Sequence, residues 1–183
     1  MKILVLSDTH GKLKKAIDVH EKIKNVDLII HCGDYQKDGE LLEQLLNTPV
    51  VSVSGNCDEQ RELEKIVSTP YGDILAVHGH LFGLDTDLAK MSYRASELNC
   101  IAVCFGHTHI PEYTIIDDIY MINPGSLSLP RDGSNGSYAV ITSTEDDFYG
   151  AVVYYDTVFP NKKDSQAKTD SRLRNLLNYS DRF

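Results

Sequence analysis

Short apolar runs alternate with helix-like spacing in the first part of the chain. Residues 3–6 form a continuous apolar run, which is typical of a strand buried on both faces, and similar runs follow at 28–30 and 50–53. Between them, apolar residues recur as on one side of a helix over 12–25 and again over 41–46, and Pro49 ends the second helix. This order of strands and helices predicts right-handed crossovers and a largely parallel sheet.

The pattern changes in the second part, where strands dominate. Apolar runs at 66–68 and 74–77 flank the turn signal Pro-Tyr-Gly-Asp and predict a hairpin. Apolar spacing over 88–98 predicts one more helix, with Asp85 or Thr86 as its N-cap. Further strands are predicted at 101–105, 113–116, 119–122, 138–142 and 149–155. An α/β first half that leads into a strand-rich second half predicts two packed sheets with outer helices.

Length and composition are those of an ordinary globular protein. The chain has 183 residues, 42% of them hydrophobic and 25% charged, and we expect one domain over 1–159. No run reaches the roughly 18 apolar residues that a membrane span needs. The apolar run near the N-terminus is too short for a signal peptide. Because the four cysteines form no Cys-x-x-Cys pair, a reduced, cytoplasmic protein is expected.

The formal net charge of −9 counts against a general binder of polyanions. Nucleic acids and anionic membranes bind clustered Lys and Arg, whereas the first 159 residues hold 12 basic and 24 acidic groups. Residues 160–183 differ, with six basic and three acidic groups, and are expected to form a basic tail or a short helix. We therefore expect neither non-specific nucleic-acid binding nor membrane binding.

Asp, Asn and His gather directly after the predicted strands. The segments are Asp8-Thr9-His10, Gly33-Asp34, Gly55-Asn56-Cys57-Asp58, His78-Gly79-His80 and Gly106-His107-Thr108-His109. Because the carboxyl ends of strands in an α/β sheet form the ligand crevice, these side chains are expected at one rim. Carboxylate, imidazole and amide oxygen suit Mn, Fe, Zn, Ni or Co.

Seven candidate ligands are too many for one tetrahedral ion. They are Asp8, His10, Asp34, Asn56, His78, His107 and His109. Seven ligands suit two divalent transition-metal ions, with Asp34 as the natural bridge. Two such ions can clamp the attacking and leaving oxygens of an in-line phosphoryl displacement.

In this order, the five motifs resemble the calcineurin-like metallophosphoesterases. Within that superfamily, the short length, the Gly-Asn-Cys-Asp motif and the run from Asn123 to Arg131 resemble the small YfcE-type phosphodiesterases. The resemblance covers residues 1–131 as motifs and 1–158 as a pattern. It implies an αββα sandwich of two mixed β-sheets flanked by helices.

The resemblance also implies how the ligands divide. One ion would be held by Asp8, His10, Asp34 and His109. A second ion would be held by Asp34, Asn56, His78 and His107. A hydroxide bridging the ions, with Mn²⁺ as the expected metal, would attack the phosphorus of a small phosphate ester, and a phosphodiester is the expected class. A homodimer is a further expectation.

The residue after Gly55-Asn56 departs from the pattern of many phosphatases in this superfamily. There a His can assist the leaving group, but here the residue is Cys57. Because a thiol is a poor substitute, we expect a preference for phosphodiesters or for esters with good leaving groups. The candidate catalytic residues are Asp34, Asn56, His80 and Asp58, the last two as auxiliary acids or as residues that support the ligands. The candidate substrate contacts are Asn56, His80 and Arg131.

Other residues have plainer interpretations. His20 and His31 are expected to be surface or core residues, a supporting role behind the ligands being the alternative for His31. His31-Cys32 begins like the cysteine-phosphatase signature His-Cys-x5-Arg, but Asp38 stands where the Arg would be, so that mechanism fails. The alternative function is an interaction scaffold that keeps this fold, as in a retromer subunit. A scaffold needs no complete ligand set.

Overall fold

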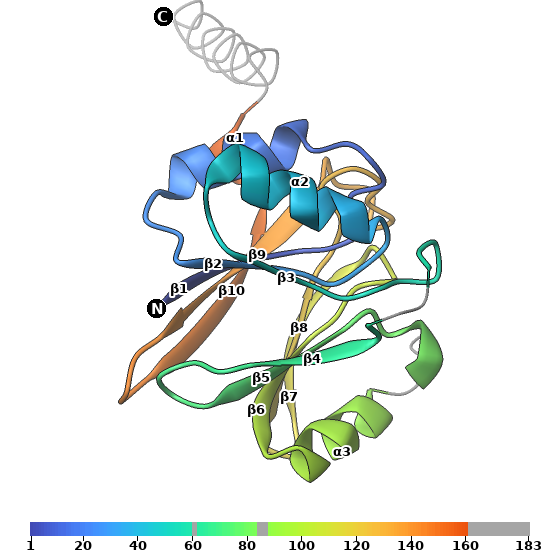
Figure 1. The fold of residues 1–183 in the computed structure, drawn as a ribbon, viewed down its shortest axis with the longest axis vertical. Coiled ribbons are helices and arrows are strands. Elements are labelled where there is room, and N and C mark those ends of the chain that lie inside the picture. Colours follow the sequence, from blue (N-terminus) through green and yellow to red (C-terminus); the bar gives the residue numbers. More distant parts are fainter. Residues whose placement is uncertain (60–61, 84–87, 161–183) are drawn as a thin grey trace, which may run out of the picture.

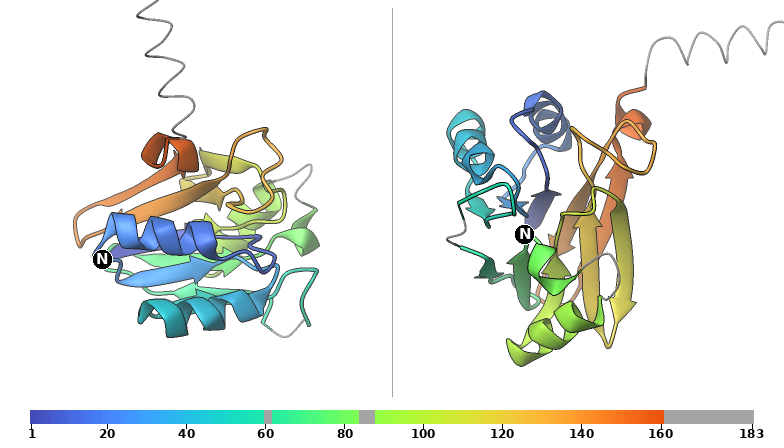
Figure 2. Two further views of the ribbon diagram at one scale, coloured as in Figure 1. Left: turned by 90° about the horizontal axis from the view of Figure 1, so that it is seen from above. Right: turned by 90° about the vertical axis from the view of Figure 1, so that its right-hand side faces the viewer.

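Two five-stranded β-sheets pack face to face in the computed structural model, which describes residues 1–59, 62–83 and 88–160. Helices α1 (Lys14–Ile23) and α2 (Gln36–Leu46) cover the outer face of one sheet, and α3 (Ala89–Glu97) lies against the other (Figure 1). The right-hand view in Figure 2 shows the same order, with α1 and α2 at the top and α3 at the bottom. The predicted αββα sandwich of two mixed sheets is confirmed.

The first sheet has the strand order β10-β9-β1-β2-β3. Its strands are β1 (Lys2–Leu6), β2 (Leu28–His31), β3 (Val50–Ser52), β9 (Ser137–Ser143) and β10 (Phe148–Tyr154). The first three run parallel, as the crossover pattern predicts, whereas β9 and β10 pair antiparallel. Helices cover one face of β1 and β2 and the second sheet covers the other, which explains their continuous apolar runs.

The second sheet has the strand order β4-β5-β6-β8-β7. Its strands are β4 (Glu64–Val67), β5 (Asp73–Val77), β6 (Cys100–Cys104), β7 (Pro111–Ile116) and β8 (Ile119–Pro124). The predicted hairpins β4-β5 and β7-β8 are both present, and β5, β6 and β8 run parallel. Each sheet thus has three adjacent parallel strands, and the candidate ligands lie in loops at the ends of these strands.

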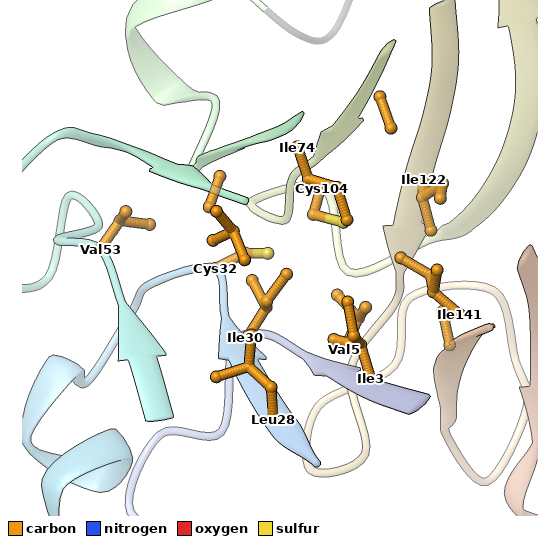
Figure 3. Packing of buried hydrophobic residues seen from close by; sticks show 14 of the residues in the cluster. Ile3, Val5, Leu28, Ile30, Cys32, Val53, Ile74, Cys104, Ile122 and Ile141 are labelled. Carbon is orange, nitrogen blue, oxygen red and sulfur yellow. The ribbon is translucent and has the colours of Figure 1, made fainter. Parts of the chain in front are cut away.

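Apolar side chains from both sheets fill the space between them (Figure 3). Val5 and Ile30 of the first sheet point toward Ile74 and Cys104 of the second, and all four are 0% exposed. Burial of a side chain such as Ile contributes about 1.5–3 kcal/mol to folding. This shared core holds the two sheets, and therefore their loops, in one fixed relation.

A few elements differ from the sequence prediction. The 3-10 helix η1 (His80–Phe82) and the short helix α4 (Tyr155–Val158) were not predicted. Helix α2 begins at Gln36, well before the apolar spacing over 41–46. That spacing did not predict the first turn of the helix, because the residues of this turn are polar. The N-cap of α3 is Leu88, so the predicted N-cap at 85–86 is wrong. The tail predicted at 160–183 lies outside the described residues, except for Pro160. Within the described part of the chain, no helix is long and apolar enough to cross a membrane.

Candidate metal centre

Asp8 and Asp34 are buried carboxylates that follow neighbouring strands. Asp8 comes just after β1 and Asp34 just after β2, and these strands pair in parallel. The Asp8 N–H donates to the carbonyl of Gly33 at 3.0 Å, which joins the two loops. Asp8 is 0% exposed and Asp34 is 3% exposed. Carboxylates so deeply buried require cations or hydrogen-bond donors beside them.

His10 and His109 complete one cluster with these two carboxylates. The four side chains each offer a ligand atom, and these atoms all lie within 4.8 Å of one another. Nε2 of His109 is 3.2 Å from Oδ1 of Asp8, and Nε2 of His10 is 3.7 Å from Oδ2 of Asp34. This is the set that the resemblance assigns to one ion.

His78, Asn56 and His107 lie on the other side of Asp34. Nε2 of His78 is 3.3 Å from Oδ1 of Asp34 and 3.2 Å from Oδ1 of Asn56. The ring centroids of His78 and His107 are 5.2 Å apart. Because one oxygen of Asp34 faces His10 and the other faces His78, its carboxylate lies between the two groups. All seven candidate ligands therefore gather at one rim.

Buried polar atoms in this centre lack hydrogen-bond partners within the described residues. They include Nε2 of His10, while Oδ1 of Asp8 has the contact to Nε2 of His109 given above. A buried unsatisfied group of this kind costs about 1–3 kcal/mol, so its presence in a native fold calls for an explanation such as a bound ion. Carboxylate oxygens and imidazole nitrogens suit divalent first-row transition metals. The unpaired atoms and the donor set both fit such a metal.

Backbone carbonyls hold two of the histidines in the tautomer that a metal requires. Nδ1 of His78 is 2.7 Å from the carbonyl of Cys32, and Nδ1 of His109 is 2.6 Å from that of Leu129. A carbonyl can only accept, so Nδ1 carries the proton in each ring. In the neutral ring Nε2 then offers its lone pair to the centre.

Asp8 and His109 shift each other's pKa in opposite directions. Burial alone would raise the pKa of Asp8, but the hydrogen bond from His109 and the nearby imidazoles together lower it. Burial alone would lower the pKa of His109, but the hydrogen bond and charge of Asp8 raise it. A proton shared in this way is what a divalent ion displaces when it binds.

Five of the seven candidate ligands have left-handed backbone conformations. The values of φ are 54° at Asp8, 46° at His10, 54° at Asp34, 70° at His107 and 58° at His109. Residues other than glycine pay about 1–3 kcal/mol for such a conformation, which persists only where the surroundings hold it. At Asp8 this hold comes from Ser126 and Ser128, whose hydroxyls donate to its carbonyl at 2.9 and 2.8 Å.

Asn123, which was not predicted as a site residue, supports the loop that carries His107 and His109. Its Nδ2 donates to the carbonyl of Gly106 and to Oγ1 of Thr108, both at 3.0 Å. The only signal in the sequence was its place at the start of the run that ends at Arg131. Its amide therefore positions ligands without offering an atom to the cluster.

The remaining predicted residues lie around the cluster. Both oxygens of Asp58 accept backbone N–H groups, from Gln36 at 2.8 Å and Gly55 at 2.9 Å, which binds the 55–58 loop to the start of α2. Both oxygens of Asp58 therefore help to hold this loop, and its role as an auxiliary acid stays a prediction. Arg131 is exposed, and its backbone N–H donates to the carbonyl of His109 at 3.1 Å.

His80 packs beside the second ligand group, which consists of Asn56, His78 and His107. Its ring centroid is 5.4 Å from that of His78 and 6.2 Å from that of His107. Burial, followed by these two imidazoles, lowers the pKa of His80. A neutral ring that touches the ligand group can form a hydrogen bond to a bound substrate.

Cys57 lies at the open edge of the site. Its N–H donates to Oδ1 of Asp34 at 3.0 Å, and the residue is exposed. Partial burial, followed by the hydrogen bond and charge of Asp34, raises the pKa of its thiol to about 11. A groove of about 730 Å³ begins here and extends along the start of α2 past Tyr35 and Glu40. The thiol thus stands between the ligands and this open groove.

Comparison with known proteins agrees with the geometry. Residues 1–146 match the calcineurin-like phosphoesterase superfamily domain. The chain is 38% identical over 161 residues to the probable metallophosphoesterase YsnB of Bacillus subtilis, covering 85% of this chain and 91% of that protein. It is 29% identical over 168 residues to the phosphodiesterase YfcE of Escherichia coli K12, covering 77% and 87%.

A solved structure leads to the same family. The crystal structure of a conserved protein from Streptococcus pneumoniae TIGR4, described as a predicted phosphoesterase, aligns with a TM-score of 0.71 at 28% identity. The alignment covers 85% of this chain and 90% of that one. The fold, the rim of Asp, Asn and His side chains and these relatives lead to one conclusion: the chain belongs to the calcineurin-like metallophosphoesterase superfamily.

Proposed function

We propose that the protein is a dinuclear metal-dependent phosphodiesterase that hydrolyses a small phosphate ester. The observation that carries this proposal is the carboxylate of Asp34, which turns one oxygen toward His10 and the other toward His78. A carboxylate placed in this way can bridge two ions. Family membership supports phosphoester hydrolysis, and the name of the relative YfcE supports a phosphodiester.

The chain's own residues would divide the work of binding. One ion would be held by Asp8, His10, Asp34 and His109. The other would be held by Asp34, Asn56, His78 and His107. When bound, two divalent ions, Mn²⁺ in this proposal, neutralise phosphate charge and make water nucleophilic near neutral pH.

Substrate would approach from the open side of the rim. Asn56 is exposed, so its Nδ2 can donate to a phosphate oxygen while its Oδ1 faces His78. His80 can offer a ring N–H from beside the second ligand group. Arg131 is exposed near His109 and can add positive charge for the anionic ester. These three residues orient the phosphate for in-line displacement.

Cys57 limits the choice of leaving group. A thiol is a poor proton donor to a departing alkoxide at neutral pH. Esters whose leaving groups depart as stable anions need no such donor. We therefore include in the proposal a preference for aryl or other activated phosphodiesters over simple alkyl phosphate monoesters.

The proposal includes a cytoplasmic location. All four cysteines are free thiols in the structure, which is the state that a reducing compartment maintains. The homodimer expected from the resemblance stays a prediction.

Hydrolysis of bis(p-nitrophenyl) phosphate tests the function. Protein stripped of metal should be inactive, should gain activity with Mn²⁺ and should cleave the diester faster than p-nitrophenyl phosphate. Asp34→Ala and His107→Ala should each lose at least about 1000-fold in rate, because each removes a residue that would hold an ion, and the ions stabilise the transition-state charge. His20→Gln is the matched control, because His20 hydrogen-bonds Thr48 on the helical layer instead of joining the cluster.

The scaffold interpretation makes the opposite prediction for the same protein. A scaffold would bind no Mn²⁺ and would show no hydrolysis after Mn²⁺ is added. Unchanged turnover in correctly folded Asp34→Ala would also overturn the proposal, because the bridging carboxylate would then be dispensable.

A further inference from the structure

The loop from Asp8 to Gly11 has left-handed backbone at a candidate metal ligand and close to it on both sides. Asp8, His10 and Gly11 all have left-handed backbone conformations, with φ of 54°, 46° and 74°. His10 directs Nε2 toward Asp34 from the middle of this loop. The serine hydroxyls described above hold only the carbonyl of Asp8. A second set of contacts is therefore needed to hold the far side of His10.

Asp38 provides these contacts from helix α2. Its Oδ2 accepts a hydrogen bond from Oγ1 of Thr9 at 2.6 Å and another from the N–H of Gly11 at 2.8 Å. Thr9 and Gly11 are the two neighbours of His10 in the sequence. Asp38 is only 7% exposed, so little water competes for these bonds. One carboxylate oxygen thus fixes the backbone on both sides of the ligand.

His31 determines which atoms donate in the hydrogen bonds around Thr9. It is the last residue of β2, is 0% exposed, and has Nε2 at 2.8 Å from Oγ1 of Thr9. Because the Thr9 hydroxyl gives its proton to Asp38, Nε2 of His31 must donate to Thr9. Burial lowers the pKa of His31, which keeps the ring neutral. The chain of donors therefore runs from His31 through Thr9 to Asp38.

We propose that Asp38, together with Thr9 and His31, is a positioning relay that sets the affinity of the ion site containing His10. The inference rests on the proposed metal centre. None of the three residues belongs to the cluster of Asp8, His10, Asp34 and His109, so their effect acts through the loop. Loss of supporting contacts of this kind lowers metal affinity about 10–100-fold.

The relay is expected to act on one ion more than on the other. Asp8, His10 and the relay all belong to the loop after β1 or bind to it directly. The second group depends on different supports, such as the carbonyl of Cys32 behind His78. A selective loss at one site is therefore the signature of positioning, whereas a uniform loss would indicate general destabilisation.

Titration of the metal-free full chain with Mn²⁺ tests this inference. Calorimetry and Mn²⁺ electron paramagnetic resonance report the number of ions, the affinity of each and their magnetic coupling. Asp38→Ala should weaken one of two ions about 10–100-fold and leave the other within about threefold. Asp38→Asn should restore most of the affinity, because one amide oxygen can accept both hydrogen bonds.

Two further variants separate the relay from overall stability. Thr9→Val keeps the side-chain shape but removes the hydroxyl. It should lower the affinity for the same ion as Asp38→Ala does, although Asp38 itself is unaltered. Thr48→Val is the matched control, because it removes the hydroxyl that pairs with His20 at 2.9 Å elsewhere in the helical layer. It should leave both ions unchanged. Melting temperatures of the metal-free variants show that each has folded.

The outcomes distinguish this inference from the proposed function. If the wild type binds two ions and both Asp38→Ala and Thr9→Val bind them with unchanged affinity, the relay is overturned alone. An equal loss at both ions, in either variant, also overturns it. If the wild type binds no Mn²⁺, the proposed function fails and the relay fails with it.

Discussion

Oδ1 of Asp34 lies 3.3 Å from Nε2 of His78, and the two residues come from different sheets. Asp34 follows β2 of the first sheet, and His78 follows β5 of the second. The carbonyl that orients His78 belongs to Cys32, which also follows β2. The centre is therefore assembled by the packing of the sandwich, and its geometry depends on the core between the sheets.

The bridging position of Asp34 predicts an unequal loss of metal between two variants. Asp34→Ala should lose both ions, because each ligand group faces one of its oxygens. His10→Ala should lose one ion and keep the other. Elemental analysis after dialysis against Mn²⁺ measures the ratio of metal to protein. Asp18→Ala, which removes a carboxylate paired with Lys14 on the surface of α1, should keep the wild-type ratio. Full retention of one ion by Asp34→Ala would contradict a shared carboxylate.

Gly106→Ala is expected to damage both stability and metal binding. A Cβ at this position would collide with Oγ of Ser7 and stand 2.7 Å from Oδ2 of Asp8. Overpacking of this kind costs about 1–3 kcal/mol, and here it presses on a ligand. Urea denaturation and Mn²⁺ titration measure the two effects. Gly133→Ala is the control, because its Cβ would meet nothing within 4 Å and only its left-handed backbone is strained. Unaltered Mn²⁺ affinity in Gly106→Ala would show that Asp8 tolerates the contact.

The thiol of Cys57 should react slowly despite its exposure. With a pKa of about 11, only about 0.1% of it is thiolate at pH 8, and the rate of alkylation should rise about tenfold per pH unit up to pH 10. Asp34→Asn removes the negative charge that raises this pKa, so Cys57 should react faster at pH 8 in that variant. Mass spectrometry of iodoacetamide-treated, metal-free protein measures the rate for the peptide that carries Cys57. A plateau in rate near pH 9 would contradict the raised pKa.

Buried His31 should make the metal-free protein less stable in mild acid. Its pKa is lowered in the folded chain, whereas the unfolded chain has a pKa of about 6.5. Between these values the unfolded state binds more protons, so stability falls as the pH falls below about 6.5, by up to about 1.4 kcal/mol per pH unit. His31→Asn removes this titration and should show a shallower fall between about pH 6.5 and 5.5 in urea unfolding. Parallel curves for the two proteins would exclude His31 as the source.

The candidate ligands were predictable because residue type and strand ends coincide. A buried strand is a continuous apolar run, so its carboxyl end is visible where Asp8 or His107 interrupts the run. The adjacent parallel strands of each sheet then bring such ends together. The same logic explains why the layers of the fold and most strands could be predicted from the sequence.

Features that depend on distant contacts could not be predicted. Helix α2 begins at Gln36, whose N–H is accepted by Asp58 from a loop beyond β3. Asn123 supports a loop 17 residues earlier through the carbonyl of Gly106. His31 was expected to be a surface or core residue, with a supporting role as the alternative, and the structure places it in contact with Thr9 beside a candidate ligand. In each case, residue type alone does not reveal a partner that only the folded chain supplies.

At His10, selection for stability and selection for metal binding favour different residues, because the backbone there is left-handed. Glycine or asparagine would adopt that conformation at lower cost, so a chain relieved of the need to bind metal would gain by losing the imidazole there. In lineages where this fold has turned to other tasks, this position should therefore be among the first to drift.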